Sequence, residues 1–347
     1  MKYVDIEKIG SVVSRLELGR GVNVVTECFE PKVGDVIVVR ALSESLTYGN
    51  LELPSGRLAK IRTGDTLVGA LGKRRALKGF VGEVPRSVRA GDHLHLLNMG
   101  GVIGICQGHH SSFSDAIEVE VIGLACDADR KIANIADGAL TPENDLAPSA
   151  PIVLIAGTCM NSGKTVAATE IIKQASNEGI RVAAAKLSGI ACLRDTLHMQ
   201  DNGAFVTASF LDCGLPSTVD HDDLPMVAKT LLNHLNTFSP DMIVVELGDG
   251  IVGGYSVDAV LEDPEIRAAI ATFVFCASDY VGVIGGSAVL GDMGIEIDVV
   301  AGSVTDSKMG EDYIQQHFGI PAGNARRNGK RLFELVYTPV QAARLAA

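Results

Sequence analysis

One segment of the chain, residues 151–172, constrains the fold more than any other. A run of apolar residues, Ile152–Ala156, leads into the nine-residue loop GTCMNSGKT, and an amphipathic helix pattern follows at once. A buried strand, a glycine-rich loop and a helix together form the local structure of a phosphate-binding loop, because backbone N–H groups and the helix dipole then face an anion. The residues expected to surround a phosphate are Gly157, Thr158, Asn161, Ser162, Gly163, Lys164 and Thr165.

The last two residues of this loop have separate expected tasks. Lys164 is expected to reach the β- and γ-phosphates of a nucleotide, and the Thr165 hydroxyl to bind Mg²⁺. A GKT triplet at a helix start also occurs by chance, but the strand before it and the helix after it favour the phosphate loop. The segment therefore predicts a magnesium–nucleotide site.

Residues 151–347 alternate between buried strand patterns and amphipathic helix patterns. Near-continuous apolar strands separated by helices are typical of a parallel sheet that is covered on both faces. We therefore expect an α/β, doubly wound, mostly parallel sheet in this part of the chain. The expected strands are Ile152–Ala156, Val182–Lys186, Met242–Glu246, Thr272–Cys276 and Ile297–Ala301, and the expected helices include Gly163–Asn177 and Leu224–Leu235.

The N-terminal part has a different pattern. Between Val22 and Val121, short β-rich runs alternate with turns, and three of these turns carry a Gly-Asp pair at a spacing near 30 residues. This pattern predicts a smaller β-barrel-like domain over residues 1–136. Residues 137–150 are polar and proline-containing, so we expect them to link this domain to a second domain over residues 151–347.

Composition excludes several classes of protein. Lys and Arg number 30 and Asp and Glu 42, for a formal net charge of −12, so a molecule-wide basic surface for nucleic acid or anionic membrane is not expected. No apolar run approaches the roughly 20 residues of a membrane span, and the charged N-terminus does not resemble a signal peptide. Seven cysteines without a CxxC pair predict neither a disulfide framework nor a zinc ribbon. A cytoplasmic location is expected.

The spacing of the phosphate loop, G-T-x-x-x-x-G-K-T, resembles that of dethiobiotin synthetase and its relatives, the cobyric acid synthase and molybdopterin-guanine dinucleotide protein B type of P-loop proteins. The resemblance covers about residues 151–304, and the N-terminal domain has no counterpart in it. It implies a P-loop fold, ATP and Mg²⁺ as cofactors, and phosphorylation or ligation of a small carboxylate or carbamate-type substrate.

Three further positions match this family. The resemblance implies that Lys186 contacts substrate, and that Asp201 and Glu246 bind Mg²⁺ with Thr165. Glu246 also stands out by itself, since a carboxylate that ends a buried apolar strand needs a partner. From the residues alone, Lys186 is also compatible with a solvated strand end and Asp201 with a helix N-cap. Asp249 is a second candidate for the magnesium task of Glu246.

Two departures from the pattern affect the expected nucleotide. Cys159 occupies the position at which the ParA-like branch carries a second lysine, which counts against a partner-activated ATPase of that kind. The adenine-reading asparagine of dethiobiotin synthetase has no evident equivalent, because Gly302 and Ser303 stand at that point, and no guanine-reading Asn-Lys-x-Asp run is present. ATP is favoured by the resemblance, and GTP stays open.

A second candidate site lies in the N-terminal domain. Cys106, His109 and His110 follow a glycine-rich strand and have side chains that can bind Zn²⁺ or a softer metal. No fourth ligand is visible nearby, and a polar turn with two histidines is the simpler interpretation.

Three functions remain open from sequence. The first is an ATP-dependent kinase or ligase with a small-molecule substrate, for which Lys164, Lys186 and Glu246 would be catalytic. The second is a nucleotide-dependent assembly or metal-delivery factor whose N-terminal domain holds the partner. The third is a coenzyme-A-dependent transferase whose phosphate loop binds the pyrophosphate. A homo-oligomer, such as a homodimer, is expected in each case.

Overall fold

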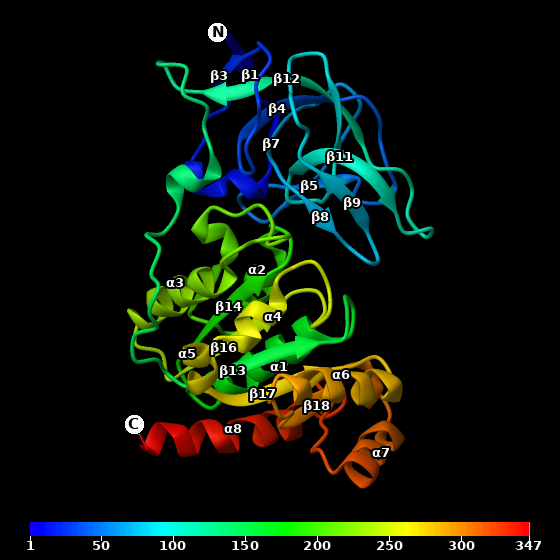
Figure 1. Ribbon diagram of the computed structural model, residues 1–347, viewed down its shortest axis with the longest axis vertical. Helices are drawn as coiled ribbons and strands as arrows, with labels where there is room; N and C mark the ends of the chain where they lie inside the picture. The colour runs from blue at the N-terminus through cyan, green and yellow to red at the C-terminus, as the bar shows by residue number, and fades with distance from the viewer. Residues whose placement is uncertain (347) are drawn as a thin grey trace. The chain divides into compact units, whose positions relative to one another are not determined.

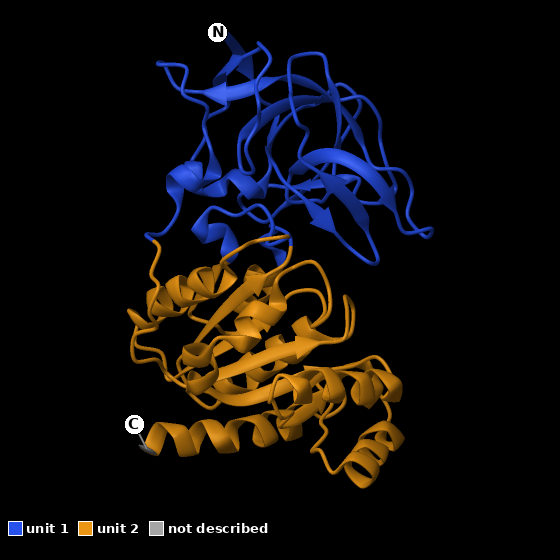
Figure 2. Ribbon diagram, viewed as in Figure 1, with its two compact units in different colours: residues 1–141, 190–194, 210–219 blue, residues 142–189, 195–209, 220–347 orange. Residues whose placement is uncertain are grey.

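The computed structural model describes residues 1–346, which divide into two compact units (Figures 1 and 2). Unit 1 contains residues 1–141, 190–194 and 210–219, and unit 2 contains 142–189, 195–209 and the residues from 220 onward. Among the described residues, no helix combines the length and the apolar character that crossing a membrane requires.

Unit 1 is a β structure built around a closed ring of strands. β10 pairs with both β11 and β12, so β12, β4, β7, β11 and β10 follow one another around a complete circuit. The pairings in the ring are antiparallel except for β7 with β11, which is parallel. The barrel-like domain expected from sequence is therefore observed. Its strands are β1 (Lys2–Asp5), β2 (Lys8–Ile9), β3 (Gly21–Val25), β4 (Val36–Ala41), β5 (Asn50–Glu52), β6 (Leu58–Lys60), β7 (Thr66–Leu71), β8 (Arg74–Arg75), β9 (Phe80–Glu83), β10 (His93–Leu96), β11 (Val102–His109) and β12 (Glu118–Cys126).

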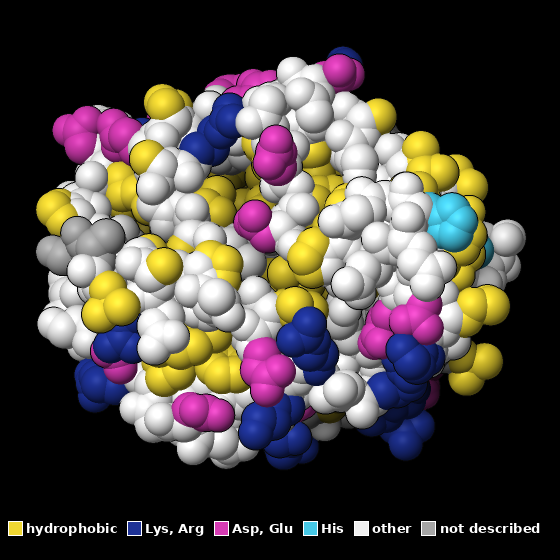
Figure 3. Space-filling view, turned by 90° about the horizontal axis from the view of Figure 1, so that it is seen from below, with side chains coloured by type: hydrophobic (Ala, Val, Ile, Leu, Met, Phe, Trp, Pro, Cys, Tyr) yellow, Lys and Arg dark blue, Asp and Glu magenta, His cyan; other side chains and the backbone are white. Residues whose placement is uncertain are grey.

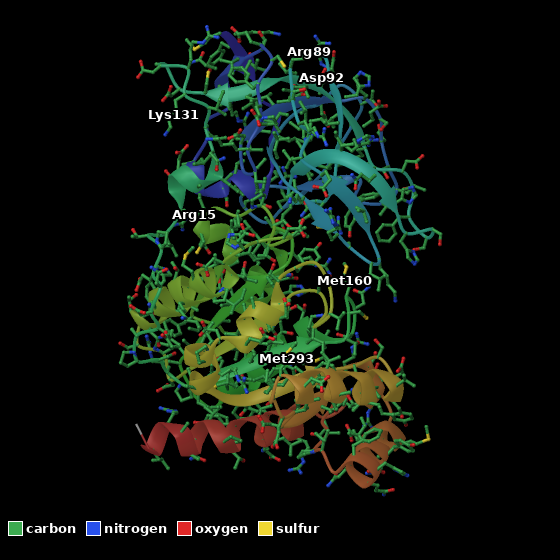
Figure 4. All side chains as sticks on the ribbon, viewed as in Figure 1. Arg15, Arg89, Asp92, Lys131, Met160 and Met293 are labelled. Carbon is green, nitrogen blue, oxygen red and sulfur yellow. The ribbon has the colours of Figure 1, made fainter. Side chains whose placement is uncertain are left out.

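The three Gly-Asp turns share one local structure. In each, the glycine adopts a positive φ of 87°, 95° or 89°, which side-chain-bearing residues rarely take. The aspartate side chain then accepts a hydrogen bond from the backbone N–H three residues earlier, and Figure 4 labels Arg89 and Asp92 of the third turn. The bonds are Lys32 N–H to Asp35 at 2.7 Å, Arg62 N–H to Asp65 at 2.6 Å and Arg89 N–H to Asp92 at 3.0 Å.

Unit 2 is an α/β structure with a six-stranded parallel sheet in the order β15-β14-β16-β13-β17-β18. α1 and α8 pack on one face, where Ala168, Ile172 and Val336 belong to a core cluster with the sheet. α3 adds no residue to that cluster and packs against β14 and β15. The elements are β13 (Ile152–Gly157), α1 (Lys164–Asn177), β14 (Val182–Ser188), α2 (Arg194–Asp201), β15 (Val206–Ser209), α3 (Leu224–Asn236), β16 (Met242–Leu247), α4 (Val257–Glu262), α5 (Pro264–Ala269), β17 (Ile270–Cys276), α6 (Tyr280–Asp292), β18 (Val299–Ala301), α7 (Lys308–Phe318) and α8 (Gly329–Ala346).

Five strands of this sheet match the strands expected from sequence to within two residues, and the sixth, β15, does not appear among the expected strands. The glycine-rich run Gly282–Gly291 lies within helix α6. Its glycines allow close packing: a Cβ added at Gly286 would lie 2.2 Å from the Phe275 ring of β17.

The boundary between the units differs from the expected one. Part of the expected linker lies along α3, where side chains on one face of the helix accept hydrogen bonds from its backbone. These bonds run from Glu143 N–H to Thr230, from Ala147 N–H to Asn233 and from Ala150 N–H to Asn236, each at 2.9 Å.

The expected domain of residues 151–347 is also interrupted, since 190–194 and 210–219 belong to unit 1. Asn98 donates to Ala191 O there, and Leu140 N–H donates to Asp212 O. Both contacts join residues far apart in sequence.

Charges of both signs lie side by side on the face seen in Figure 3, with hydrophobic side chains scattered among them. Ion pairs within single helices show the same mixing, such as Lys308 with Asp312 at 2.8 Å in α7. Exposed pairs of this kind contribute little to stability.

A candidate phosphate-binding site

The phosphate loop connects β13 to α1, as the sequence predicts. Asn161 and Gly163 have φ values of 64° and 106°, so the loop reverses direction just before the helix begins. Two glycines permit close backbone contacts: a Cβ at Gly157 would lie 2.5 Å from Cys276 O, and one at Gly163 would lie 2.8 Å from Gly302 Cα. The backbone of the phosphate loop therefore requires glycine at both positions. Met160, which Figure 4 labels, is also a residue of this loop.

Lys164 is the first residue of α1 and folds back over the loop. Its side chain is buried, with the residue 5 % exposed, and Nζ donates to Cys159 O at 2.8 Å. Burial lowers the pKa of Lys164, while the negative charges of Glu246 and Asp249 raise it. A buried cation held against the loop carbonyl is placed to meet an anion at the loop, and the anion would favour its charged form.

Ser162 contributes a buried polar atom without a partner. Its Oγ has no hydrogen-bond partner among the described residues, although the residue is fully buried. The main chain of Ser162 is well paired, since its carbonyl accepts from Ser303 N–H at 3.2 Å. Buried hydroxyls are normally hydrogen-bonded, so an unpaired one inside a phosphate loop indicates a missing partner.

Thr165, in the first turn of α1, and Glu246, on β16, come together. Glu246 lies near the end of β16, and the Thr165 hydroxyl donates to its Oε1 at 2.9 Å. The other carboxylate oxygen, Oε2, is buried and has no partner among the described residues, although the residue is only 3 % exposed. A hydroxyl beside a carboxylate with one unused oxygen is a donor set that fits Mg²⁺, which takes few protein carboxylates and keeps several waters.

Lys186 lies on β14 directly beside Glu246 of β16 in the parallel register. It forms a short ion pair with Asp195, in the first turn of α2, and both side chains are largely buried. Glycines surround the lysine: a Cβ added at Gly189 or Gly248 would lie 3.3 or 3.2 Å from its Cε. Asp195 therefore lies beside the site through its ion pair with Lys186.

Asp201 does not join this group. It is exposed at the C-terminal end of α2, six residues beyond Asp195, which at about 1.5 Å per residue is roughly 9 Å along the helix axis. The expectation that Asp201, Thr165 and Glu246 converge is not met by the arrangement of the chain, because α2 directs its first turn to Lys186 instead.

A loop after β16 lies against the phosphate loop. Ile251 N–H donates to Gly157 O at 2.9 Å, and a Cβ at Gly250 would lie 2.4 Å from Thr158 O. Asp249, in the same loop, has a φ of 64°, and its charge reaches Lys164. The loop is placed beside the phosphate loop, as a substrate-facing segment needs.

A small cavity of about 50 Å³ adjoins the other side of the phosphate loop and is lined in part by Gly302, Ser303 and Asn324. Asn324 is buried, and its Nδ2 donates to Thr305 at 3.1 Å and to Asp306 at 2.9 Å. Its oxygen accepts two backbone N–H groups, so both ends of its amide are engaged in shaping the chain. The sequence analysis missed this residue, whose side-chain partners become visible only in the fold.

The residues Cys106, His109 and His110 do not form a metal centre. Cys106 and His109 line a cavity of about 750 Å³ in unit 1, whereas His110 pairs with Ser112 at 2.8 Å. Among residues 1–346, no group of three or more His, Cys, Asp or Glu side chains is arranged to hold a metal ion. His109 lies between the His110 carbonyl and Asp115, and these two contacts raise its pKa.

No known protein family and no curated protein matches the chain in sequence. Its fold is similar to solved structures at low identity. A DUF1611 family protein from Anabaena variabilis is 15% identical over 58% of this chain and 63% of its own, with a TM-score of 0.42. The signal recognition particle 54 kDa protein from Aeropyrum pernix, in complex with GDP, is 15% identical over 58% of this chain and 49% of its own, with a TM-score of 0.39. The cell division protein FtsY from Thermotoga maritima is 15% identical over 56% and 71%, with a TM-score of 0.37.

These likenesses are weak, so the assignment of the fold rests on the chain itself. Unit 2 has a parallel sheet with helices on both faces and a strand–loop–helix phosphate loop at the carboxyl end of β13. The loops that follow β13 and β16 meet at this edge, as ligand-binding loops do in open α/β sheets. The chain is an α/β protein that joins a P-loop unit to a β-barrel-like unit.

Proposed function

We propose that unit 2 binds a nucleoside triphosphate with Mg²⁺ and uses it to phosphorylate or ligate a small carboxylate or carbamate-type substrate. One observation carries the proposal: the unpaired Oε2 of Glu246 lies on the same carboxylate that accepts from Thr165, next to a phosphate loop that holds a buried lysine. An unpartnered buried carboxylate oxygen is costly unless a cation or donor completes it.

In this proposal, different residues bind the phosphates, the Mg²⁺ ion and the substrate. Backbone N–H groups of the loop and Lys164 would bind the phosphates, with Ser162 Oγ as an additional donor. Thr165 and Glu246 would hold Mg²⁺, which supplies charge neutralisation at the phosphates when bound. Lys186, beside Glu246 in the register, would face the transferred group and the substrate. Phosphoryl transfer of this kind depends mainly on positioning and electrostatic stabilisation.

ATP is the nucleotide we favour, on the resemblance of the loop spacing, and GTP is the alternative. The described residues offer no free asparagine amide at the small cavity beside Gly302, since the Asn324 amide is engaged at both ends. Base selectivity in this proposal therefore rests on the backbone and on other side chains near Ser303.

A second candidate is a nucleotide-dependent assembly factor. It is favoured by one feature, namely that residues 190–194 and 210–219, which follow β14 and β15, belong to unit 1. A conformational change at the phosphate site would then be transmitted along the covalent chain to these residues of unit 1. Hydrolysis that a small acid accelerates supports the enzyme, and hydrolysis that only a protein partner accelerates supports the assembly factor.

The test is a thermal-shift series with ATP, GTP and coenzyme A, each with and without Mg²⁺. A ligand at 100 times its dissociation constant adds about 2.7 kcal/mol to the free energy of unfolding, which is an easily measured shift. We expect the largest shift with Mg-ATP and a smaller one without Mg²⁺. A shift with coenzyme A alone, unaffected by Mg²⁺, would replace the proposal with a coenzyme-A-dependent transferase. No shift with any of the three would contradict phosphate-loop binding itself.

A further inference from the structure

Glu52, at the end of β5 in unit 1, is a buried carboxylate that the phosphate site does not contain. The residue is 1 % exposed, and its two oxygens accept from three donors that are all neutral. Oε2 accepts from Leu193 N–H at 2.7 Å and from the Ser11 hydroxyl, and Oε1 accepts from the Cys192 thiol at 3.1 Å. Two of these three donors belong to one short segment, residues 190–194, so this carboxylate holds that segment.

We call residues 190–194 the strap. Further contacts within unit 1 fix it: Asn98 Nδ2 donates to Ala191 O at 2.7 Å, and Ala191 N–H donates to Pro216 O at 2.9 Å. Gly100 packs so closely that an added Cβ would lie 2.2 Å from Ala191 O. The strap is therefore held at Ala191, Cys192 and Leu193, and the charged Glu52 carboxylate accepts from the last two of these residues.

The strap is continuous with the Lys186 region of unit 2. It begins four residues after Lys186 and ends one residue before Asp195, the partner of that lysine. Each contact lies within a single unit: Glu52 and the strap belong to unit 1, and Lys186 and Asp195 belong to unit 2. The peptide bond between residues 194 and 195 makes the connection between the two sets of contacts.

From this arrangement we propose that Glu52 is a positioning residue for Lys186. By holding Leu193 and Cys192, Glu52 fixes the start of α2, and α2 in turn holds Asp195 against the lysine. The role of Lys186 at a phosphoryl group rests on the proposed function, whereas the mechanical connection to Glu52 does not. Leu193 N–H and the Ser11 hydroxyl would lose this acceptor if the carboxylate were replaced, so the strap would loosen at this point.

The first experiment measures the chemical reactivity of Lys186 without nucleotide. An amine-acylating reagent is applied to the parent and to Glu52→Gln, and the rate at Lys186 is read by mass spectrometry. We expect a severalfold higher rate in Glu52→Gln, approaching that of Asp195→Asn, in which the ion pair is removed directly. Glu120→Gln is the matched control, because Glu120 is a β12 carboxylate whose contact is the exposed Arg40 at 3.4 Å, and it should leave the rate unchanged.

A parent-like Lys186 rate in folded Glu52→Gln would overturn the inference. If Glu52→Gln does not fold, Cys192→Ala serves in its place, since it removes one of the two bonds between the strap and the carboxylate. We then expect a smaller rise at Lys186, and a parent-like rate in Cys192→Ala would overturn the inference as well.

The second experiment separates this inference from the proposed function. Affinity for Mg-ATP should stay within about twofold in Glu52→Gln, because residues 157–165 of the phosphate loop belong neither to the strap nor to α2, while substrate turnover should fall together with that of Asp195→Asn. If the parent binds no nucleotide, the proposed function fails and the acylation rates still decide the positioning role. If nucleotide binds and the Lys186 rate does not respond to Glu52→Gln, the positioning role fails alone.

Discussion

Two buried glutamates, one in each unit, show how a structural carboxylate differs from one that awaits a ligand. Glu52 in unit 1 is 1 % exposed and uses both oxygens, while Glu246 in unit 2 is 3 % exposed and uses one. Burial is therefore nearly equal, and the difference lies in the pairing. Since an unpaired buried carboxylate oxygen destabilises a fold, a chain retains one where a ligand completes it.

Nε of Arg74 is a third buried atom without a hydrogen-bond partner among the described residues. It shows that an unpaired polar atom does not by itself indicate a ligand-binding site. The Arg74 guanidinium lies over the Tyr48 ring, 4.8 Å from its centroid, and Nη2 donates to the Tyr48 hydroxyl at 2.9 Å. The positive charge of Arg74 is therefore stabilised by a cation–π contact with the Tyr48 ring. Glu246 is distinguished by the phosphate loop beside it.

Lys164→Ala is expected to have the largest effect. It should lower affinity for Mg-nucleotide at least a hundredfold and leave the fold intact, because Lys164 is assigned only to the phosphates. Isothermal titration calorimetry measures the affinity and circular dichroism the fold. Lys173→Ala, on the same helix and about half exposed, is the matched control. Parent-like nucleotide affinity in Lys164→Ala would contradict the phosphate-loop assignment.

Glu246→Gln tests the unpaired oxygen directly. The variant keeps the shape and removes the charge, so nucleotide should still bind while Mg²⁺-dependent turnover falls by about a hundredfold or more. Its free energy of unfolding should change little, because the amide oxygen still accepts from Thr165 and the amide nitrogen takes the place of the oxygen that has no partner. Unchanged turnover would exclude Glu246 from the site and transfer the magnesium task to Asp249.

Lys186→Ala should affect substrate more than nucleotide. We expect about a tenfold loss in kcat/KM for the substrate and less than a threefold change in nucleotide affinity, because β16 lies between β14, which carries the lysine, and β13, which leads into the phosphate loop. Steady-state kinetics and calorimetry measure the two quantities. A loss of nucleotide affinity equal to that of Lys164→Ala would place Lys186 at the phosphates instead.

Glu52→Ala should cost stability, in contrast to Glu246→Gln. Removing the carboxylate takes one acceptor away from Leu193 N–H, the Ser11 hydroxyl and the Cys192 thiol, and the loss of hydrogen bonds to a charged group costs on the order of 1–3 kcal/mol each. Urea denaturation of the two variants tests the comparison on one scale. Equal stability of Glu52→Ala and the parent would remove the distinction between the two glutamates.

The smallest expected effect is a shift in the pKa of His109. Its contacts with the His110 carbonyl and Asp115 raise its pKa above the ordinary 6.5, and Asp115→Asn should lower it partway. Because the pKa of His109 is raised in the folded state, its charged ring stabilises the fold at low pH. This stabilisation is lost as the pH rises through the folded-state pKa. NMR titration of the ring protons measures the midpoint. A midpoint at or below 6.5 in the parent would show that these contacts do not favour the charged ring.

Local patterns in unit 2 were predictable because each depends on residues close in sequence. β13, the loop and α1 follow from an apolar run, two glycines and a helix start within residues 151–172. β15 was missed because its four residues, Val206–Ser209, carry too short an apolar pattern to stand out. The glycines of α6 weaken its helix propensity, whereas the close packing of Gly286 on Phe275 favours the helix in the fold.

The amino-acid sequence by itself determined the phosphate loop, the alternation of strands and helices around it, and the β-rich character of the first 136 residues, since all three depend on neighbours along the chain. The tertiary structure alone decided which polar groups meet. Thr165 and Glu246 are 81 residues apart, and Glu52 and Leu193 are 141 apart, so no local spacing relates them. The side chains that complete a buried carboxylate, or leave it incomplete, are brought there by the packing of distant segments, and that packing separates the structural glutamate from the one at the candidate site.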